Sequence, residues 1–564
     1  MTLPTFDRDD TVAVALRPGV GLGLARGADT WAITDADPVA LVAELHAAGA
    51  PRWVWWGRET SDVLAGLPID RCWDISTVHR FLHGTWKAPL GGVWATLQGL
   101  SLDSLPTMGQ LDLLDAPVDE GDREQPIRPD GHLRPEWIDG GFGASPERLA
   151  AWAALALGAM TTQHELLATL PDPARALSTA RSESAADLLC AEMTASGLPI
   201  DVAEAERLIL DAAGRRPRTL AEEDEIRAER DELVLARLEP RQPVNLRNPG
   251  EVKAMLRRQG FDLPDTRAWR LEQLRDEPLI DALLTWRKDE RIATTYGWHW
   301  LDEHVHEGRL RGGWASSDGA AGRMTASAGL HNLPSMMRPV VAAEPGHRLV
   351  RADLGQIEPR VLAAVSGDRR LIEATRQDDL YAPIARTLGV ERDIAKVAVL
   401  GAMYGATTGE SAGALAGLQK SYPVAMGLLE EAAESGKHGR DVFTSGGRRV
   451  RMWTDTAQDG DLDRAVSVAA ARGRYARNAM IQGAAAEFFK VWAITVRRRG
   501  RPMRAEVVLC LHDELLVHVP AEHADEAASM VDTAVQEAAH YWSPDPDVRF
   551  VADVSVVDRW SEAK

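Results

Sequence analysis

The stretch His347–Arg360, HRLVRADLGQIEPR, decides the fold of this chain. Residues 349–352 are apolar except for Arg351, a pattern that predicts a buried strand. We expect the strand to end at Asp353 and Leu354–Arg360 to turn into a helix. A carboxylate at the end of a buried strand is costly to desolvate unless a cation or hydrogen bonds compensate it. Taken alone, an aspartate that caps the next helix explains this pattern better than a catalytic one.

A second element, Arg392–Gly405, has the sequence RDIAKVAVLGAMYG and the spacing of a helix. Four side chains recur every four residues, so each step advances about 400° and they share one broad face. These side chains are Arg392, Lys396, Leu400 and Tyr404. Such a strip could hold a triphosphate at its cationic end and a base and sugar at the other. The alternative is a half-exposed helix that buries the leucine and tyrosine in a core.

A third element, Val507–Pro520, reads VVLCLHDELLVHVP and predicts a β-hairpin with acids at its tip. Burying strands that present Asp513 and Glu514 requires a compensating charge. A divalent cation shared with Asp353 would supply it, because Mg²⁺ prefers carboxylate oxygens and substrate phosphates. Two such ions would suit an in-line phosphoryl displacement. For a lone His-Asp-Glu, a turn with no catalytic role is the more common explanation.

Composition and charge limit the classes of protein that fit. The chain has 564 residues, 45% of them hydrophobic and 26% charged, which fits a globular protein of about two to four domains. We find neither an apolar run long enough to span a bilayer nor a signal-peptide pattern. The 3 cysteines are scattered and suggest neither disulfides nor a zinc site. We therefore expect a cytoplasmic protein.

The net charge of −20 argues on average against a nucleic-acid partner. Binding depends on local patches, however, and basic clusters do occur. They lie at 215–218, 257–258, 287–291 and 497–499. Each such cluster is more often a solvated helix face than a phosphate-binding track.

The chain also changes character along its length. Residues 1–100 alternate short strands with an amphipathic helix, which is an α/β pattern. Residues 103–147 are rich in Pro, Gly and Asp and predict a long loop. We place a domain boundary near 171–178 and expect 178–300 to be mostly helical. Within that part, Asn245–Pro249 is typical of a helix N-terminal cap.

The three elements, in this order, resemble motifs A, B and C of the family A DNA polymerases, the DNA polymerase I family. They read Asp-x-x-Gln-Ile-Glu-x-Arg from Asp353, Arg-x-x-x-Lys-x-x-x-x-x-x-x-Tyr-Gly from Arg392, and His-Asp-Glu from His512. Two further pieces are similar to the family's segments before motifs A and C. They are Gly322–Arg323 with Asn332–Leu333–Pro334, and Arg474-x-x-x-Asn478-x-x-x-Gln482–Gly483. The resemblance covers roughly residues 178–560.

The resemblance implies a multidomain fold of α/β and α+β parts. An N-terminal ribonuclease H-like, 3′–5′ exonuclease-type α/β domain would occupy 1–175. A right-hand polymerase domain would occupy 176–564. Within it, the helical thumb would lie at about 190–310, the palm at about 310–365 and 470–564, and the fingers at about 366–470. We expect no 5′-nuclease domain, because the chain starts directly at the exonuclease-like module.

The resemblance also implies roles for individual residues. The catalytic set would be Asp353, Asp513, Glu514 and Lys396, with Asp353 and Asp513 binding two Mg²⁺ ions, or alternatively Mn²⁺. The nucleotide-binding set would be Arg392, Lys396, Leu400, Tyr404, Glu358, Gln356 and Tyr381. The DNA-binding set would be Arg323, Asn332, Arg360, Arg474, Asn478, Gln482, His512, Asn245 and Arg287.

Some of these roles are specific. Arg392 and Lys396 would contact the incoming triphosphate, with Lys396 also a proton donor to the leaving pyrophosphate. Tyr404 would pack under the templating position. Glu358 would be a steric gate that closes off the space of a ribose 2′-hydroxyl.

The chain departs from the family's pattern at three places. Leu354 and Gly355 replace the Tyr-Ser pair that usually follows the first aspartate of motif A. Leu400 replaces the motif B aromatic, and Tyr381 stands where a phosphate-contacting histidine is usual. None of these changes removes a metal ligand or both cations, so we expect polymerisation with altered speed or nucleotide discrimination.

The N-terminal region lacks the family's exonuclease acids. The strand at Thr11–Leu16 runs into Arg17–Pro18 instead of carrying Asp-x-Glu, and Asp122-x-Glu124 lies in a loop. Asp62 and Asp74 lack the usual preceding Asn, and no acid occurs at Trp152–Ala156, where a Tyr-x-x-x-Asp pattern is expected. Without three or four carboxylates, this region cannot hold the two metals that the family's exonuclease uses. We predict an exonuclease-like fold that has lost hydrolysis.

The resulting hypothesis is a template-directed DNA polymerase, a nucleotidyltransferase that extends a primer with dNTPs in repair or gap filling. We expect a bacterial, nucleoid-associated monomer that binds primer-template DNA and no membrane. The alternatives are a catalytically weak DNA-binding scaffold, an enzyme that keeps its exonuclease, and a single-subunit RNA polymerase. Glu358 argues against the last, since a ribonucleotide needs room there.

Overall fold

The computed structural model of the chain describes residues 3–108, 123–318, 320–405, 412–454 and 462–563. They form two compact units. The first unit comprises Met1–Ser196, Gly313–Ala326 and Gly346–Val557. The second comprises Gly197–Gly312, Ser327–Pro345 and Asp558–Lys564.

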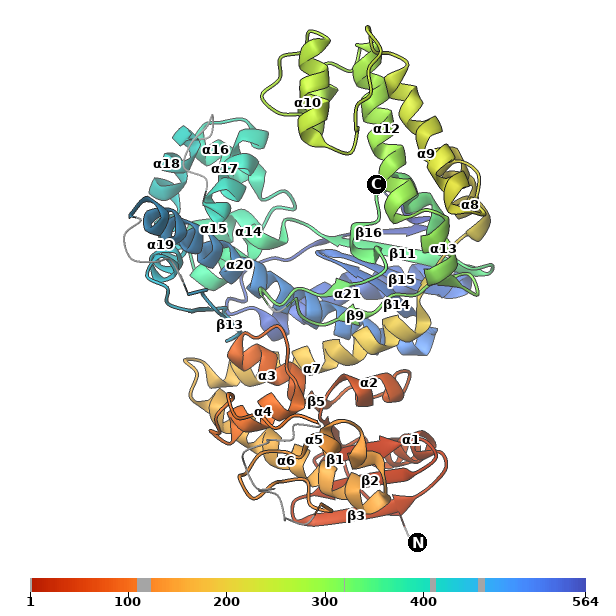
Figure 1. Cartoon of the computed structure of the whole chain (residues 1–564). Helices are drawn as coiled ribbons and strands as arrows, with labels where there is room; N and C mark the ends of the chain where they lie inside the picture. Colours follow the sequence, from red (N-terminus) through yellow and green to blue (C-terminus); the bar gives the residue numbers. More distant parts are fainter. Residues whose placement is uncertain (1–2, 109–122, 319, 406–411, 455–461, 564) are drawn as a thin grey trace. The chain divides into compact units, whose positions relative to one another are not determined.

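The N-terminal part of the first unit is built on a 5-stranded sheet of order β3-β2-β1-β4-β5 (Figure 1). Strand β1 pairs antiparallel with β2 and parallel with β4, which in turn pairs parallel with β5. The strands are β1 (Thr11–Arg17), β2 (Gly21–Arg26), β3 (Asp29–Thr34), β4 (Arg52–Trp55) and β5 (Cys72–Asp74). The short strands and the amphipathic helix expected within residues 1–100 are confirmed.

Helices cover both faces of this sheet. The helices are α1 (Pro38–Gly49), α2 (Arg58–Leu64), α3 (Ile75–His83), α4 (Leu90–Leu97), α5 (Pro135–Ile138), η1 (Gly141–Gly143), α6 (Pro146–Ala168) and α7 (Pro173–Ser196). One core joins α3, α4 and α6 to the sheet, and a second joins α1 and α7 to its other face. Trp53, Trp55 and Trp73 are fully buried, which fixes the sheet between these layers.

The predicted loop at 103–147 is only partly irregular. Its described part contains the short helix α5 and the turn η1 before α6 begins, and Ser145 caps α6 by accepting from the Arg148 N–H. Residues 109–122 of this predicted loop lie outside the described part of the chain.

A second sheet in the first unit, the central sheet, has the order β14-β15-β11-β16. Its strands are β11 (His347–Leu354), β14 (Glu506–Leu511), β15 (Glu514–Pro520) and β16 (Ala552–Val557). All neighbouring strands are antiparallel. The predicted strand before Asp353 and the predicted hairpin are thus confirmed as adjacent strands of one sheet.

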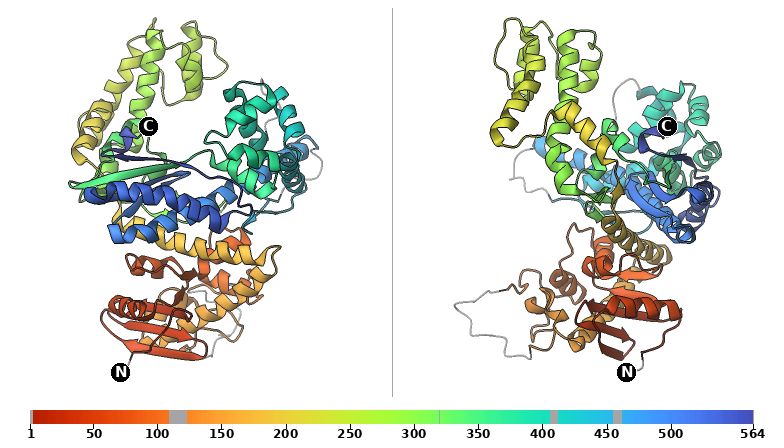
Figure 2. Two further views of the ribbon diagram at one scale, coloured as in Figure 1. Left: turned by 180° about the vertical axis from the view of Figure 1, so that it is seen from behind. Right: turned by 90° about the vertical axis from the view of Figure 1, so that its right-hand side faces the viewer.

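Two helices, α20 (Leu462–Gly500) and α21 (Ala524–Trp542), pack along this sheet, as Figure 2 shows from behind. Helix α7 packs on α20 and also contacts β5, so it joins the N-terminal sheet to the central sheet. A buried ion cluster reinforces this contact. Glu183 of α7 pairs with Lys490 of α20 at 2.7 Å and with Arg448 at 2.5 Å.

The remaining helices of the first unit form a helical lobe between residues 357 and 437. They are α14 (Ile357–Ser366), α15 (Arg369–Thr375), α16 (Tyr381–Leu388), α17 (Arg392–Tyr404), α18 (Ala412–Ser421) and α19 (Pro423–Lys437). Short elements complete the unit: β9 (Trp314–Ala315), β10 (Thr325–Ala326), β12 (Val442–Phe443), β13 (Arg449–Val450), η4 (Arg501–Met503) and η5 (Ala521–His523).

The second unit is mostly helical, as predicted for 178–300. Its helices are α8 (Val202–Ala213), α9 (Leu220–Leu235), α10 (Pro249–Arg258), α11 (Ala268–Glu272), α12 (Pro278–Thr295), α13 (Trp298–His304), η2 (Leu330–Asn332), η3 (Ser335–Val340) and η6 (Trp560–Glu562). A 3-stranded sheet joins β6 (Leu198–Pro199), β7 (Val305–His306) and β8 (Arg309–Leu310). Its main core lies among α9, α10, α11 and α12.

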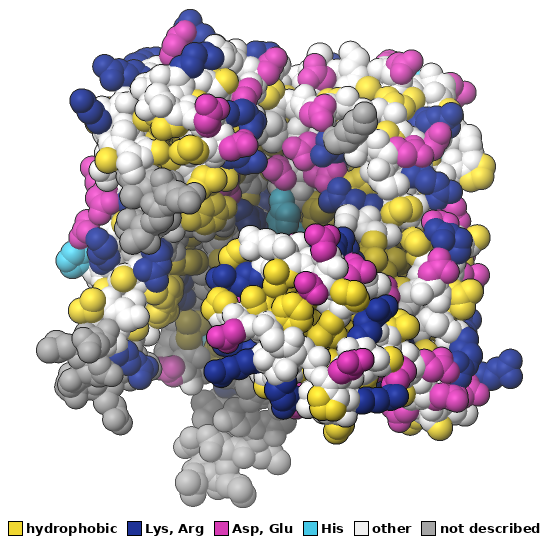
Figure 3. Space-filling view, turned by 90° about the horizontal axis from the view of Figure 1, so that it is seen from above, with side chains coloured by type: hydrophobic (Ala, Val, Ile, Leu, Met, Phe, Trp, Pro, Cys, Tyr) yellow, Lys and Arg dark blue, Asp and Glu magenta, His cyan; other side chains and the backbone are white. Residues whose placement is uncertain are grey.

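Two surface properties of the described residues bear on the expected class of protein. None of the helices that the structure describes is long and apolar enough to cross a bilayer. Basic and acidic side chains are interspersed over the face shown in Figure 3. The acidic residues behind the net charge of −20 therefore do not form one continuous acidic patch on that face.

Candidate active site

Two predicted carboxylates meet at one end of the central sheet. Asp353, near the end of β11, is the direct partner of Glu514 at the start of β15. The Leu354 N–H donates to the Asp513 carbonyl at 2.9 Å, which holds the hairpin tip beside the end of β11. The hairpin turns at His512, whose φ of 56° is rare for a residue with a side chain. The sequence prediction that these acids share one place is confirmed.

An arginine that the sequence analysis did not assign ties these acids together. The Arg351 guanidinium donates from Nη2 to Asp353 Oδ2 at 2.8 Å and from Nε to Glu514 Oε1 at 2.8 Å. It also donates from Nη1 to Asp553 Oδ2 on β16 at 3.3 Å. A period of two places Arg351 on the same face of its strand as Asp353, so strand alternation could have indicated this contact.

The crowded carboxylates at this end of the central sheet favour a bound cation. Burial raises the pKa of Asp353 to about 6, and the charge of Asp513 adds to the shift while Arg351 opposes it. Burial likewise raises the pKa of Asp513. A divalent cation would relieve this cost of crowding carboxylates in a desolvated place.

The donor set therefore fits the Mg²⁺ ions that the family resemblance implies. Carboxylate oxygens are the protein ligands that Mg²⁺ prefers, and one or two suffice when substrate phosphates complete the shell. Glu514 is 6% exposed and its carboxylate is directed to Arg351. Among the described residues, the oxygens of Asp353, Asp513 and Glu514 do not converge as one three-ligand cluster. Asp353 and Asp513 are accordingly the two candidate metal ligands.

Glu358 lies at a meeting point of three separate segments. Its carboxylate accepts from Arg323 at 3.2 Å and from the Tyr404 hydroxyl at 3.2 Å, and the Tyr404 hydroxyl accepts from Gln482 Nε2 at 3.3 Å. Burial raises the pKa of Glu358, whereas Arg323 and Tyr404 oppose that shift. The structure thus brings together predicted residues from α14, α17, α20 and the segment before β11.

A second group is organised by Asp379, which the sequence analysis did not assign. Its carboxylate accepts from Arg392 Nε at 2.7 Å, from the Tyr381 N–H at 3.2 Å and from Gln356 Nε2 at 3.5 Å. The Gln356 amide oxygen accepts from the Leu380 N–H at 2.8 Å. The signal was an acid two residues before Tyr381, but the sequence did not show its partners.

Tyr381 is placed differently from its prediction as a nucleotide contact. It is only 4% exposed, and the Arg392 guanidinium lies 5.8 Å from the centre of its ring. Burial raises its pKa to about 12. We correct the prediction: the ring is buried and supports Arg392 through a cation–π contact, so its role for a nucleotide is indirect.

Most of the strip on α17 is exposed. Arg392 and Lys396 are exposed, Leu400 is half-buried and Tyr404 is 43% exposed, whereas Ala395, Ala398, Val399 and Ala402 form the buried face. Gly405 ends the helix with a φ of 75°. A Cβ there would meet Arg474 Cγ at 2.9 Å, so both the left-handed backbone and the close helix approach require glycine.

Helix α20 presents Arg474, Asn478 and Gln482 at four-residue spacing, each exposed or half-buried, while Ala476, Ala479 and Gly483 are buried. This confirms that the three polar residues share one face.

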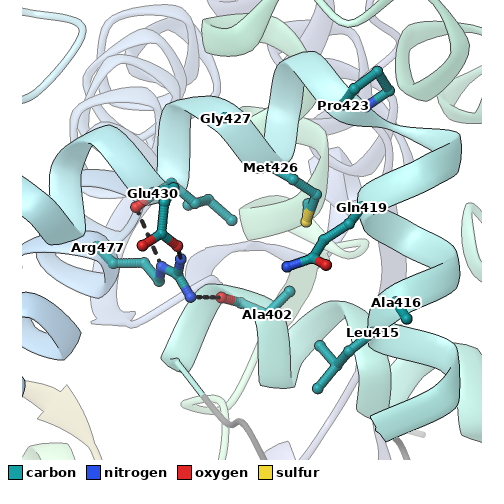
Figure 4. A pocket seen from close by; sticks show the side chains of 10 residues that line it. Ala402, Leu415, Ala416, Gln419, Pro423, Met426, Gly427, Glu430 and Arg477 are labelled. Atoms are coloured by element: carbon teal, nitrogen blue, oxygen red, sulfur yellow. Dashed lines mark hydrogen bonds and ion pairs between the residues drawn. The ribbon is translucent and has the colours of Figure 1, made fainter.

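Helix α20 also holds the helical lobe together. Arg477 donates to the carbonyls of Leu429 at 3.2 Å and Ala402 at 3.3 Å and pairs with Glu430 at 2.5 Å, beside a cavity of about 540 Å³ (Figure 4).

Arg360 does not have the predicted DNA-binding role. It is fully buried, and its guanidinium donates to five backbone carbonyls. These belong to Gly355, Thr375, Arg549, Gln377 and Asp378. Burial lowers its pKa to about 10. We correct this prediction, because a side chain surrounded by carbonyls is a structural brace and cannot reach a phosphate.

Three predicted DNA contacts belong to the second unit. Asn332 accepts from Arg291 at 3.0 Å through its carbonyl, and Asn245 accepts from the Arg247 N–H at 3.0 Å. Arg287 donates to the Thr266 carbonyl at 2.5 Å and to its hydroxyl at 3.1 Å. The Asn248 side chain caps α10, which confirms the predicted N-terminal cap.

The candidate exonuclease acids have structural roles in the described residues. Asp74 is fully buried, caps α3 and accepts from Trp55 Nε1 at 2.9 Å. Asp62 pairs with Arg58 at 2.5 Å, and Glu124 pairs with Arg148 at 2.8 Å. Asp122 lies outside the described residues. At Trp152–Ala156, the buried ring of Trp152 stacks on Phe142 at 5.3 Å.

Comparisons with known proteins agree with this geometry. The family model described as "DNA polymerase family A" matches residues 241–562. A thermostable DNA polymerase I of Thermus filiformis is 30% identical over 52% of this chain and 38% of that protein. A thermostable DNA polymerase I of Thermus thermophilus is 28% identical over 66% of this chain and 47% of that protein. The chain thus spans less than half the length of these relatives.

A solved structure is similar over nearly the whole chain. It is described as the POL domain of Pol1 from M. smegmatis in complex with DNA primer-template and dNTP. It matches with a TM-score of 0.67 and 19% identity, covering 98% of this chain and 96% of that chain. The fold, with its mixture of helices and sheets, is therefore that of a family A polymerase domain. The chain belongs to DNA polymerase family A.

Proposed function

We propose that the chain is a template-directed DNA polymerase that adds deoxynucleotides to a primer 3′ end. One observation carries the proposal. Asp353 lies near the end of β11 beside the hairpin turn that carries Asp513, and the helix that follows Asp353 is hydrogen-bonded through Glu358 to Tyr404 of α17 and onward to Gln482 of α20. The residues that two-metal phosphoryl transfer requires therefore come from one connected group.

The bound ions and the protein side chains would have separate roles in the reaction. When bound at Asp353 and Asp513, two Mg²⁺ ions would supply charge stabilisation for the attacking and leaving oxygens. Arg392 and Lys396 would bind the triphosphate, since both are exposed on one face of α17. Asp379 would hold Arg392 in place through its 2.7 Å ion pair. Lys396 would donate a proton to the pyrophosphate as it leaves.

Glu358 and the residues of α20 would position the substrates. The half-buried Glu358 carboxylate would close off the space of a ribose 2′-hydroxyl, and Tyr404 would lie under the templating base. The candidate DNA contacts on the first unit are Arg323, Arg474, Asn478, Gln482 and His512. Asn332, Asn245 and Arg287 are the corresponding candidates on the second unit. Such contacts with backbone and minor groove would carry little sequence information.

The rest of the architecture belongs to the same proposal. The second unit, mainly Gly197–Gly312, would be the thumb, the helical lobe the fingers and the central sheet the palm. The strand order of the N-terminal sheet supports an exonuclease-like fold, and the structural roles of Asp62 and Asp74 support lost proofreading. We propose a monomer that fills gaps during repair.

The test is extension of a 5′-labelled primer on a longer template with Mg²⁺ and dNTPs. Asp353→Asn and Asp513→Asn should each reduce the extension rate by on the order of a thousandfold, because metal-bound charge supplies several kcal/mol. The matched control is Asp525→Asn, an exposed acid in the first turn of α21. Tight duplex binding by the wild type without any extension would instead favour a DNA-binding scaffold.

A further inference from the structure

A cavity of about 710 Å³ lies within the first unit, where the N-terminal sheet meets α7, α20 and α21. Its walls include Arg52 and Cys72 at the starts of β4 and β5, Arg181 of α7, and Ile494 of α20. It shares no lining residue with the candidate active site. Its volume is within the range of small-molecule sites, about 300–1,000 Å³.

The cavity has an excess of positive charge. Six of its lining residues are arginines and two are acids. Both acids are already paired: Asp70 with Arg501 at 2.8 Å, and Glu537 with Arg498 and with Arg499 at 3.2 Å. Arg497 pairs with Glu192 at 2.5 Å. Among the described residues, the four other arginines (Arg8, Arg52, Arg71 and Arg181) have no acidic partner.

Arg52 and Arg181 are the two whose positions require an explanation. Both are half-buried, and Arg181 Nε is a buried donor without an acceptor in the described part of the chain. Burial lowers the pKa of Arg52, and the charges of Arg181 and Arg71 add to the shift, so these guanidinium groups repel one another. Buried donors normally have a hydrogen-bond acceptor. The missing acceptor at Arg181 Nε indicates that an anion from outside the chain binds beside these arginines.

A histidine near these arginines has the same unmet requirement. His164 Nε2 is buried and has no partner among the described residues. Burial lowers the pKa of His164, and Arg181 and Arg52 lower it further. Its ring lies edge-on to Trp73 at 4.5 Å, which fixes its orientation. His164 does not line the cavity, but a neutral imidazole near Arg181 and Arg52 adds no charge to their mutual repulsion.

We propose that this cavity binds a small phosphate-bearing ligand of mononucleotide size, with Arg52 and Arg181 binding the phosphate. Guanidinium groups match phosphate oxygens in a bidentate geometry that a single arginine-lined wall can present. The nucleoside would lie against the apolar wall of Ala185, Val491 and Ile494, together with Tyr541, a lining residue that is 51% exposed. Aromatic and aliphatic walls of this kind suit a base. The site does not depend on the proposed polymerase activity.

The test measures ligand-induced thermal stabilisation of the full chain in EDTA, because anything that binds only the folded state raises the melting temperature. The probes are orthophosphate, pyrophosphate and dAMP, each compared with chloride at equal ionic strength. The variants are Arg52→Gln and Arg181→Gln. The matched control is Arg498→Gln, which lines the same cavity but is paired with Glu537. A background of Arg392→Ala with Lys396→Ala excludes binding at the proposed triphosphate site.

We expect dAMP to stabilise both the wild type and the background protein. The dissociation constant of dAMP should rise about tenfold or more in Arg52→Gln and in Arg181→Gln. In Arg498→Gln it should rise less than about twofold. Without ligand, Arg52→Gln and Arg181→Gln should melt at or above the wild-type temperature, because they remove like-charge repulsion. Merely structural arginines would instead lower it.

Two results would overturn the proposal. One is equal stabilisation of the wild type by chloride and by all three phosphate probes. The other is wild-type affinity for the probes in both Arg52→Gln and Arg181→Gln. If orthophosphate binds as tightly as dAMP, the phosphate site stands and its nucleoside part is wrong.

Discussion

Glu358 illustrates how one carboxylate gains its position from several segments. It accepts hydrogen bonds from Arg323 and Tyr404, and its side chain is 15% exposed. Replacing it with alanine opens the space that a ribose 2′-hydroxyl would need. We predict that Glu358→Ala reduces the preference for deoxynucleotides over ribonucleotides on the order of a hundredfold, measured as a ratio of kcat/KM values.

Tyr404→Phe is the matched control for that change. It removes the hydroxyl that bonds to Glu358 and Gln482 but leaves the carboxylate in place. Its sugar preference should change by less than about threefold. Unchanged sugar selection in Glu358→Ala would show that the steric gate is elsewhere.

Arg360, in contrast to Glu358, is a motif residue whose side chain stabilises the fold. Its replacement by methionine leaves five carbonyls without their donor, including that of Thr375 at 2.7 Å and that of Asp378 at 2.7 Å. We predict that Arg360→Met lowers the free energy of unfolding by about 3–5 kcal/mol, measured by urea denaturation. The exposed Arg376→Met should cost less than about 0.5 kcal/mol. A DNA-binding role for Arg360 would instead appear as weaker duplex affinity with unchanged stability.

At the scale of elements, α20 carries a buried acid, Glu487, that accepts hydrogen bonds from the turn between β12 and β13. Glu487 is 1% exposed and accepts from the Gly446 N–H at 3.0 Å and from the Thr444 hydroxyl. Burial raises its pKa to about 7 from 4.5. The folded protein therefore keeps this proton at pH values where the unfolded chain has lost it.

The sign of the pH effect follows from that difference. A raised folded-state pKa means that stability falls as the pH rises from about 4.5 to 7 and changes no further above it. The contribution is about 3 kcal/mol. We predict that Glu487→Gln removes this part of the pH dependence, measured by urea denaturation at pH 5 and 8. The exposed Glu431→Gln should keep the wild-type slope, and an equal slope in Glu487→Gln would contradict the assignment.

At the scale of the whole molecule, the N-terminal module contains no group of three metal-ligating side chains among its described residues. Asp74 caps a helix, and the apolar core around Trp152 includes Ala15 and Ala156. We predict that a 5′-labelled primer stays intact with Mg²⁺ in the absence of dNTPs, within the background of a protein-free control. Shortening from the 3′ end by both the wild type and Asp353→Ala would show that the module is an active nuclease.

Much of the fold could be predicted from the sequence, because strands and helices follow local periodicity. The alternation before Asp353, the helical spacing in 392–405 and the hairpin at 507–520 each predicted an element that the structure contains. The motif residues on those elements were also predicted. The roles of buried motif residues were not, as Tyr381 and Arg360 show, because burial depends on neighbours that periodicity does not reveal.

The sequence by itself determined the secondary-structure elements, their order along the chain and the side chains available for catalysis and binding. The tertiary structure decided which side chains neutralise one another: Arg351 with three acids, Asp379 with Arg392, and Arg52 facing Arg181 without an acid. The partners of Arg351 on β15 and β16 are 163 and 202 residues away along the chain. The physical reason is that desolvation and ion pairing depend on distances in space, which are fixed only when segments distant in sequence pack together.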